Sequence, residues 1–333
     1  MCFHRFFLLA AFSLFFLSAG QYSDAFLNIG AGPRSIGLGQ AVCALPENPT
    51  GYLVNPAASG FVAHSQAALM YINQFDLADL TAITTTVRWR GDWKIGLNLI
   101  NFSVDGIPER PDLRRIIDLE TRRDSIRTLV AGGFRTFRDR ETAVFLNMVH
   151  DINKTFDLGW MITPFPVRIS AGVNIKLLNK ALYGLIGNGI GLDIGSMLSF
   201  SLADAVGYGW MGDLTLGLAF TDAAGTLVYW NSGKTDRIPP AVTAGFGYRQ
   251  TFRSLPVEMT FLYQKKTIET DSNLGLEIVC FNLVAVRVGD NLGRRQGGLG
   301  LRIPVGGNSV SIDYSFTAHN LGNAHRIGAG IYF

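Results

Sequence analysis

Apolar residues occupy every second position over most of the chain. Between residues 167 and 177, every odd position is apolar and every even position is small, polar or charged. The same alternation occurs in residues 81–90, 94–102, 213–220, 238–249, 257–263, 274–280, 284–288, 297–303, 309–316 and 325–333. A period of two predicts β-strands that have one apolar face and one polar face.

Two architectures share this pattern: a soluble β-sandwich, whose apolar faces meet each other, and a transmembrane barrel, whose apolar faces meet lipid. Many of the segments run about nine to eleven residues, which is the length that a tilted strand needs to cross a bilayer. Tight turns at 90–93 and 304–308 trade places with long polar loops at 105–125 and 221–236. These features favour an all-β fold, a transmembrane antiparallel up-and-down β-barrel with short turns at one end.

The charged residues of these strands lie in the register opposite to the apolar one. An arginine or lysine that faces lipid at the bilayer midplane costs roughly 2–4 kcal/mol, so we expect the charges to line the lumen. The predicted lumen-facing charges are Arg168, Lys176, Asp193, Arg249, Glu258, Glu277, Arg287, Arg302, Asp313 and Arg326. We interpret them as ion pairs across a packed interior, and the alternative is a dedicated path for a ligand or an ion.

Composition agrees with a membrane protein that has no spanning helix. The chain has 333 residues, 48% hydrophobic and 17% charged, and 38 glycines. Its one long apolar run, residues 6–17, follows Arg5 and precedes small residues. We therefore predict a signal peptide over residues 1–20, with an N-terminal anchor helix as the alternative.

The chain offers few candidates for chemistry. With a net charge of +3 and no basic tract, it is not expected to bind nucleic acid. The spacing of Cys2, Cys43 and Cys280 indicates neither a disulfide framework nor a metal site. Since no histidine lies in a recognisable Ser/His arrangement, we assign no catalytic residue, metal or cofactor. The enzyme alternative is a surface lipase-type barrel, and we do not expect an enzyme.

The segment "NIGAGPRSIGLGQA" (28–41) is rich in glycine but does not match a nucleotide-binding loop. Ser35 replaces the third glycine of the dinucleotide motif, and no P-loop lysine follows. Glycine permits left-handed backbone and close packing, which suits a segment folded inside a crowded lumen. We predict a hatch or plug over residues 21–63 and a barrel over residues 64–333.

This region resembles the PorV/PorQ branch of the FadL-like (long-chain fatty acid transporter) superfamily of outer-membrane proteins. The matching hatch residues are Gly32, Arg34, Gly37, Gly39 and Ala41, followed by Asn55, Pro56 and Ala57. Gln40 stands where the family usually has glycine, and the usual acidic pair is reduced to Glu47. Residues 102–110, 170–178, 187–198 and 321–333 also look like elements of this family.

The resemblance implies a fourteen-stranded barrel that contains an N-terminal hatch. The alternating segments themselves number nearer sixteen, with the excess around residues 156–163, so twelve to sixteen strands are allowed. Ile331 and Phe333, on the last alternating segment, resemble the C-terminal signal that outer-membrane barrels present to the insertion machinery.

Two roles follow from the resemblance, both in the outer membrane of a Gram-negative-type cell. The first, which we expect from the sequence, is protein secretion of the type IX kind, with a translocon and its secreted cargo as partners. The second is FadL-type uptake of long-chain fatty acids or other hydrophobic compounds, through a lateral opening beneath the hatch. A purely structural outer-membrane barrel is a further alternative. The expected partners in every case are outer-membrane lipid and the insertion machinery.

Overall fold

The computed structural model describes residues 24–157, 159, 164–252, 254–269, 271–318 and 322–333. The predicted signal peptide, residues 1–20, lies outside these ranges. Sixteen described strands form one antiparallel sheet. They are β1 (Gln66–Gln74), β2 (Ala78–Arg90), β3 (Trp93–Pro108), β4 (Thr136–Phe156), β5 (Phe165–Leu182), β6 (Leu185–Ser201), β7 (Asp213–Thr221), β8 (Thr226–Trp230), β9 (Thr235–Ile238), β10 (Ala241–Phe252), β11 (Val257–Lys266), β12 (Ser272–Cys280), β13 (Val284–Asn291), β14 (Arg294–Val305), β15 (Asn308–Thr317) and β16 (Ala324–Tyr332).

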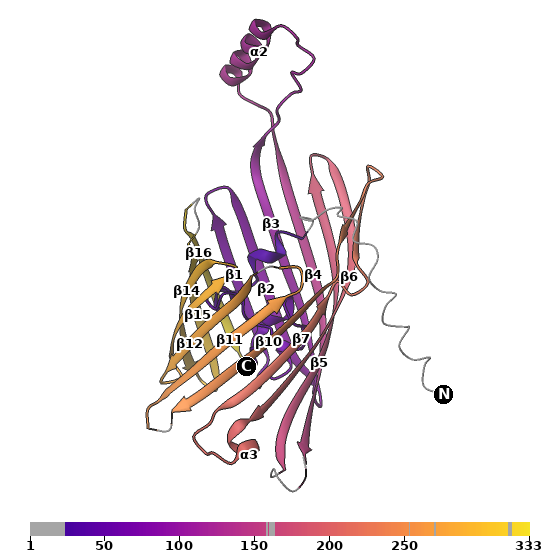
Figure 1. The fold of residues 1–333 in the computed structure, drawn as a ribbon. Coiled ribbons are helices and arrows are strands. Elements are labelled where there is room, and N and C mark those ends of the chain that lie inside the picture. Colours follow the sequence, from indigo (N-terminus) through magenta and orange to yellow (C-terminus); the bar gives the residue numbers. More distant parts are fainter. Residues whose placement is uncertain (1–23, 158, 160–163, 253, 270, 319–321) are drawn as a thin grey trace, which may run out of the picture.

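All of these strands except β8 and β9 close into a fourteen-stranded barrel (Figure 1). The first strand pairs with the last, with Gln66 opposite Tyr332, so the wall has no open edge. Closure lets the backbone N–H and C=O groups of every strand bond to a neighbouring strand. This is necessary in lipid, which offers no hydrogen-bond partners. The predicted barrel of about fourteen strands is confirmed.

The two strands in excess of fourteen form the β8–β9 hairpin, in which β8 pairs with residues Gly187–Ile190 at one end of β6. The sequence predicts the excess around residues 156–163, of which 158 and 160–163 lie outside the described residues. Between Thr221 of β7 and Thr226 of β8 the chain continues in the same direction, but the four residues 222–225 stand opposite only the two residues 239–240. Such a bulge bends the strand locally.

The outer face of the barrel is apolar along each strand. On β16, Ile327 and Ile331 are exposed, while Arg326 before them and Gly328 between them are buried. Aromatic side chains mark both ends of this band, with Trp89 and Trp93 at one end and Tyr183 and Tyr229 at the other. An apolar band between aromatic girdles is the surface of an outer-membrane barrel. Within the described ranges, no helix has the length and apolar character that crossing a bilayer requires.

Both predicted tight turns lie at the end of the barrel where β1 begins and β16 ends. Short turns are periplasmic in outer-membrane barrels, so we assign this end to the periplasm. The separation of short and long connections is only partial, however. The periplasmic end also carries residues 202–212 with helix α3 (Leu202–Val206), and tight turns at Gly184 and Gly293 lie at the opposite end.

Neither of the predicted long loops is wholly irregular. The first contains part of helix α2 (Leu119–Gly132), in an arm that projects beyond the extracellular rim (Figure 1). Asp118 caps this helix by accepting a hydrogen bond from the backbone N–H of Thr121. The second contains the β8–β9 hairpin. Both sequences are largely polar and show little apolar periodicity, so they predict loops.

The apolar belt gives a direct test of membrane embedding. Leu299 lies in the middle of β14 and is 55% exposed, and Val305 ends the same strand and is 53% exposed. We expect Leu299→Arg to lower the free energy of unfolding by about 2–4 kcal/mol and Val305→Arg by about 0–1 kcal/mol, because the cost of a charge falls towards the membrane interface. Urea titration in lipid vesicles measures both, and equal losses would contradict the assigned orientation.

Candidate functional site

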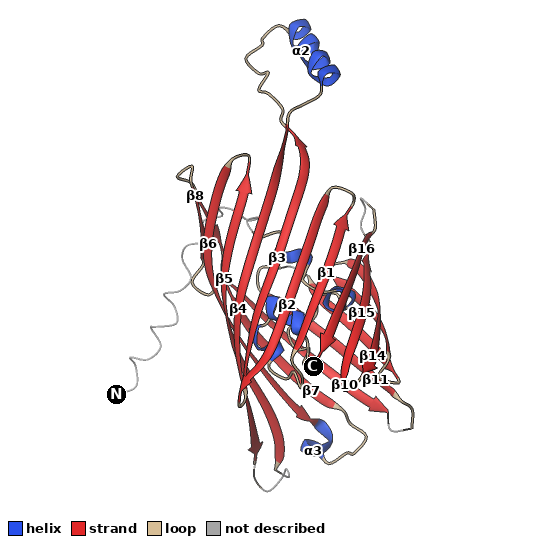
Figure 2. Cartoon of the chain, turned by 180° about the vertical axis from the view of Figure 1, so that it is seen from behind, coloured by secondary structure: helices blue, strands red, loops and turns tan. Residues whose placement is uncertain are grey.

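Residues 24–63, which we call the hatch, lie inside the barrel. Four short helices make up much of this segment: η1 (Leu27–Ile29), α1 (Pro33–Gly37), η2 (Pro49–Leu53) and η3 (Pro56–Ser59). Figure 2 shows helices behind the strands, within the cylinder. Most side chains of α1, η2 and η3 are buried. The hatch therefore fills the middle of the lumen.

Glycines of the barrel wall make room for the hatch backbone. A Cβ built on Gly172 would lie 2.5 Å from the carbonyl oxygen of Pro56, and one on Gly275 would lie 2.5 Å from that of Leu38. Seen from the hatch, a Cβ on Gly37 would lie 3.2 Å from the Cα of Gly298. The wall glycines in such contact, which we call the glycine belt, are Gly172, Gly195, Gly217, Gly245, Gly247, Gly275, Gly289, Gly298 and Gly328.

Conformational freedom and close approach coincide at one hatch glycine. Gly39 has φ +66°, a backbone conformation that favours glycine, and its Cα faces the backbone of Leu274 and Asp290. The belt glycines have no such φ, so their role is to let two backbones meet. In the sequence, the signal for this contact is glycine in the polar register of many strands.

The Asn-Pro-Ala motif anchors the other end of the hatch. The Asn55 side chain accepts a hydrogen bond from the N–H of Ala57 (3.0 Å) and so caps η3. Its amide donates to the carbonyl oxygens of Cys43 (2.8 Å) and Ser196 (3.1 Å), joining two parts of the hatch to β6. The carbonyl oxygen of Pro56 accepts from Asn147 of β4 (3.0 Å).

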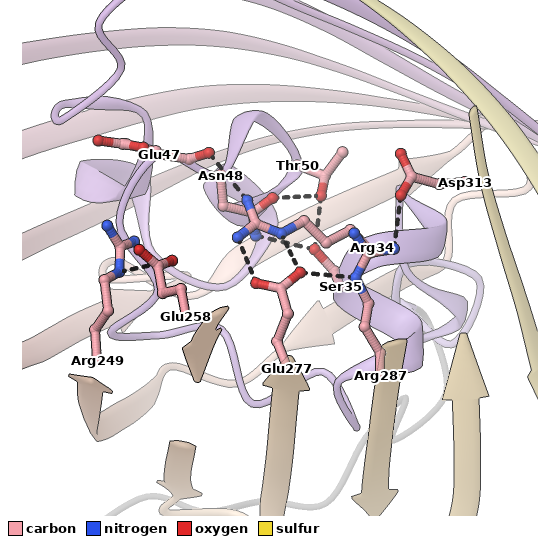
Figure 3. Close-up of polar contacts among 10 residues, drawn as sticks. All are labelled: Arg34, Ser35, Glu47, Asn48, Thr50, Arg249, Glu258, Glu277, Arg287 and Asp313. Atoms are coloured by element: carbon pink, nitrogen blue, oxygen red, sulfur yellow. Dashed lines mark hydrogen bonds and ion pairs between the residues drawn. The ribbon is translucent and has the colours of Figure 1, made fainter. Parts of the chain in front are cut away.

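Arg34 joins the hatch to the wall by an ionic cluster, drawn in Figure 3. Its guanidinium donates two hydrogen bonds to Glu277, at 3.0 and 2.7 Å. Arg287 donates to the same carboxylate (2.8 Å) and to Asp313 (2.6 Å). Glu277 and Arg287 are buried, and bidentate charge-assisted bonds of this kind are among the strongest polar contacts. Three predicted lumenal charges thus meet one predicted hatch residue.

A second buried cluster lies beside the bulge that follows β7. Lys176 pairs with Asp222 (2.6 Å) and Asp193 (3.2 Å), and the N–H of Asp222 donates to Asp193 (2.8 Å). Asp222 was not predicted, because only the bulge turns it into the lumen. The buried pairs Lys94–Asp151 and Lys180–Glu141 were also missed.

The remaining predicted residues lie nearer the ends of the barrel. Arg249 and Glu258 pair at 3.5 Å and are partly exposed. Arg302 stacks on Tyr332 (4.4 Å), and Arg168 lies over the ring of Phe61 (4.6 Å) at the open periplasmic mouth. Arg326 is buried without a carboxylate among the described residues. Ile331 and Phe333 lie on the lipid side, and the N–H of Phe333 donates to the carbonyl of Ser65.

The lumen also contains an apolar region that the sequence interpretation missed. Phe26 and Leu27 of the hatch pack there against wall residues that face inward from β1 to β5 and from the β8–β9 hairpin. We call this cluster the apolar chamber; its main residues are Phe26, Leu27, Ile36, Tyr52, Met70, Ile72, Leu80, Ile100, Phe145, Leu178, Val228 and Ile238. Apolar residues occur on both faces of β1 to β3, as with buried Leu80 and exposed Ile83 on β2, so the alternation alone hides the inward set.

A cavity of about 250 Å³ adjoins the chamber. Leu27, Leu53 and Phe145 line its apolar side, and Lys176, Asp193 and Asp222 line its polar side. Two further cavities, of about 210 and 150 Å³, lie at the periplasmic end and carry charged residues such as Arg168 and Arg302. No group of three or more His, Cys, Asp or Glu residues that could hold a metal ion occurs in the described part of the chain.

No family model and no curated protein matches the sequence. Among solved structures, the chain is similar to a FadL homologue of Pseudomonas aeruginosa (10% identity, TM-score 0.48) and to the toluene transporter TbuX of Ralstonia pickettii (12%, 0.42). It is also similar to the CymD monoaromatic hydrocarbon channel (12%, 0.48). Each alignment covers 91% of this chain and 97% of the other. At these identities the likeness concerns the fold alone.

The Arg34 cluster predicts that replacing either of two glutamates by glutamine lowers the free energy of unfolding by unequal amounts. Glu277→Gln leaves Arg34 and Arg287 buried with one carboxylate fewer, and we expect it to lower the free energy of unfolding by about 3–5 kcal/mol. Glu258→Gln breaks only a partly exposed pair, and we expect a loss of about 0–1 kcal/mol. Unfolding in neutral detergent measures both, and similar losses would show that the cluster does not hold the hatch.

The glycine belt predicts that one added methyl group loosens the hatch. In Gly217→Ala, the new Cβ would overlap the carbonyl of Cys43, and we expect a loss of about 1–3 kcal/mol from overpacking. Burial raises the pKa of the Cys43 thiol to about 12, so this thiol is unreactive near pH 8 while the hatch is docked.

Maleimide labelling in a Cys280→Ser background measures that loosening. We expect Gly217→Ala to label at Cys43 faster than the parent does. Gly209→Ala is the control, since a Cβ at Gly209 would meet nothing within 4 Å. Equal labelling of all three proteins would contradict the contact.

Proposed function

We propose that this protein carries hydrophobic compounds across the outer membrane, as FadL-type proteins do. The observation that carries the proposal is the apolar chamber. A barrel interior can be filled with paired charges, as the β12–β15 side of this lumen is. The other side of the lumen instead has an apolar surface that a hydrophobic molecule could contact, formed by the inward-facing residues Ile72, Leu80 and Ile100.

The first turn of the hatch is the part best suited to leave the chamber. Phe26 and Leu27 occupy it, but η1 has three residues and is closed by single 3₁₀ bonds such as Gly30 N–H to Leu27 carbonyl (3.2 Å). The rest of the hatch is fixed by the glycine belt, Arg34 and Asn55. A ligand that displaces η1 would therefore gain the apolar wall without unfolding the hatch.

The wall beside the chamber contains a break. The bulge at residues 222–225 faces Pro239 and Pro240, and β8 beyond it pairs with only four residues of β6. Pro has no N–H to donate to a ladder, which weakens the pairing at this point. The lateral opening that the family resemblance implies would lie here, with the Lys176–Asp222 pair across it. Type IX secretion is the other role that the resemblance implies, and the chamber has no evident part in it.

Binding of a fluorescent apolar probe, N-phenyl-1-naphthylamine, tests this function. We expect the wild-type protein to bind the probe saturably and the Phe26→Ala/Leu27→Ala variant to bind it more tightly, because the large-to-small changes open space in the chamber. Phe61→Ala is the control, since Phe61 is equally buried in a separate cluster with Ala57 and Met197.

The absence of saturable binding by both the wild-type protein and the double variant would contradict the proposal. Recovery of secreted cargo and a large translocon in a pull-down would favour secretion instead. Deleting residues 21–56 is a poorer test, because it also removes the partners of the glycine belt.

A further inference from the structure

The buried basic residues of the wall follow one rule. Lys94, Lys176, Lys180 and Arg287 each face the lumen, and each is buried. Each also forms an ion pair with a carboxylate of the wall, namely Asp151, Asp222, Glu141 and Glu277 in that order. This is expected, because an unpaired charge taken out of water costs several kcal/mol even after the protein relaxes.

Arg326 is the exception among the described residues. It is 6% exposed, as buried as the other four. One guanidinium nitrogen, Nη1, donates to the hydroxyl of Thr317 (2.7 Å) and to the carbonyl of Ala324 (3.3 Å). The Nε–H has no partner, and no described carboxylate lies within ion-pair distance. Asp313, the acidic residue of the neighbouring strand, is already bonded to Arg287.

The groups around Arg326 are also polar and under-satisfied. Ser315 stands opposite Arg326 in the β15–β16 register, and its buried hydroxyl has no partner. Gln296 donates to Thr317 from β14 (3.1 Å), and its side-chain oxygen has no partner. An amide side chain can present either its oxygen or its NH₂ after a rotation. Three adjacent strands therefore bring hydrogen-bond donors together without an acidic group.

We propose that Arg326 and Ser315 bind an oxyanion, a phosphate, sulfate or carboxylate group, near the extracellular end of the lumen. Arginine stays charged in proteins and its planar donors match such groups, so a bound anion removes the cost of the unpaired cation. Buried polar groups that lack partners are where an ion is to be expected. The site does not depend on the proposed function, since an uncharged hydrophobic compound has no use for it.

The anion has two possible sources, which share this chemistry. Ile72 of the apolar chamber stands opposite Arg326 on the β1 side. A free oxyanion would use Arg326 and Ser315 alone. The headgroup of an amphiphile would also place its apolar tail against Ile72.

Thermal unfolding in neutral detergent, at constant ionic strength, tests the site with inorganic phosphate as the probe. We expect phosphate to raise the unfolding midpoint of the wild-type protein, by an equal step for each tenfold rise in concentration once the site is saturated. Arg326→Gln should lose this shift, and without phosphate it should be at least as stable as the wild type, because the unpaired charge is gone. Arg326→Lys should keep part of the shift.

Arg302→Gln is the matched control, a lumenal arginine of β14 that stacks on Tyr332, and it should respond as the wild type does. Octyl phosphate in place of inorganic phosphate separates the two sources. If octyl phosphate raises the unfolding midpoint more than inorganic phosphate does, and Ile72→Ala reduces that larger shift, the ligand is an amphiphile. If the two compounds raise the midpoint equally, the ligand is a free anion. The proposal is overturned if phosphate shifts the wild type and Arg326→Gln alike or shifts neither, or if Arg326→Gln is destabilised and Arg326→Lys is not.

Discussion

The contact between the hatch backbone and the lumenal glycines is the constraint on which the rest of the structure depends. A closed barrel that must satisfy its own backbone leaves a lumen of fixed width. At Gly172 and Gly275 the absent side chains let a second backbone lie directly on the wall. Once the hatch is seated, Arg34 reaches Glu277 and Asn55 reaches β6. The ionic cluster and the Asn-Pro-Ala anchor are thus consequences of that close approach.

The same seating divides the lumen into two unlike sides. Paired charges fill the wall around β12 to β15, where a dense network leaves little room for an apolar ligand. In the part of β1 to β5 that lines the chamber, inward side chains such as Ile72 and Leu80 are apolar and pack against several hatch residues, among them Phe26 and Tyr52. Arg326 lies on the border of these regions, between Ser315 and Ile72. The hydrophobic route and the anion site that we propose both rest on this asymmetry.

Period two, together with the length of the segments and the pattern of turns and loops, predicted the barrel, and contact with lipid explains why one face of each strand lacks charge. It also placed Glu277, Arg287 and Asp313 in the lumen, where they meet. It could not predict Asp222, which a bulge turns inward, or helix α2, whose sequence lacks an apolar face wide enough to stand out. The apolar chamber was not predicted because strands such as β2 carry apolar residues on both faces. The role of Gly217 was equally hidden, since its partner, the Cys43 carbonyl, is far away in sequence.

A disulfide between hatch and wall measures the seating of the hatch most directly. A Cβ built on Gly245 would lie 3.1 Å from the Cβ of Cys43, near the separation of about 3.8 Å found in disulfides. In intact outer membranes, with Cys280 replaced by serine, Gly245→Cys should oxidise to a protein without free thiols, whereas Gly330→Cys should keep both thiols. If Gly245→Cys retained two free thiols, counted after the same oxidation and subsequent denaturation, the hatch would not lie on the glycine belt and the account would fail.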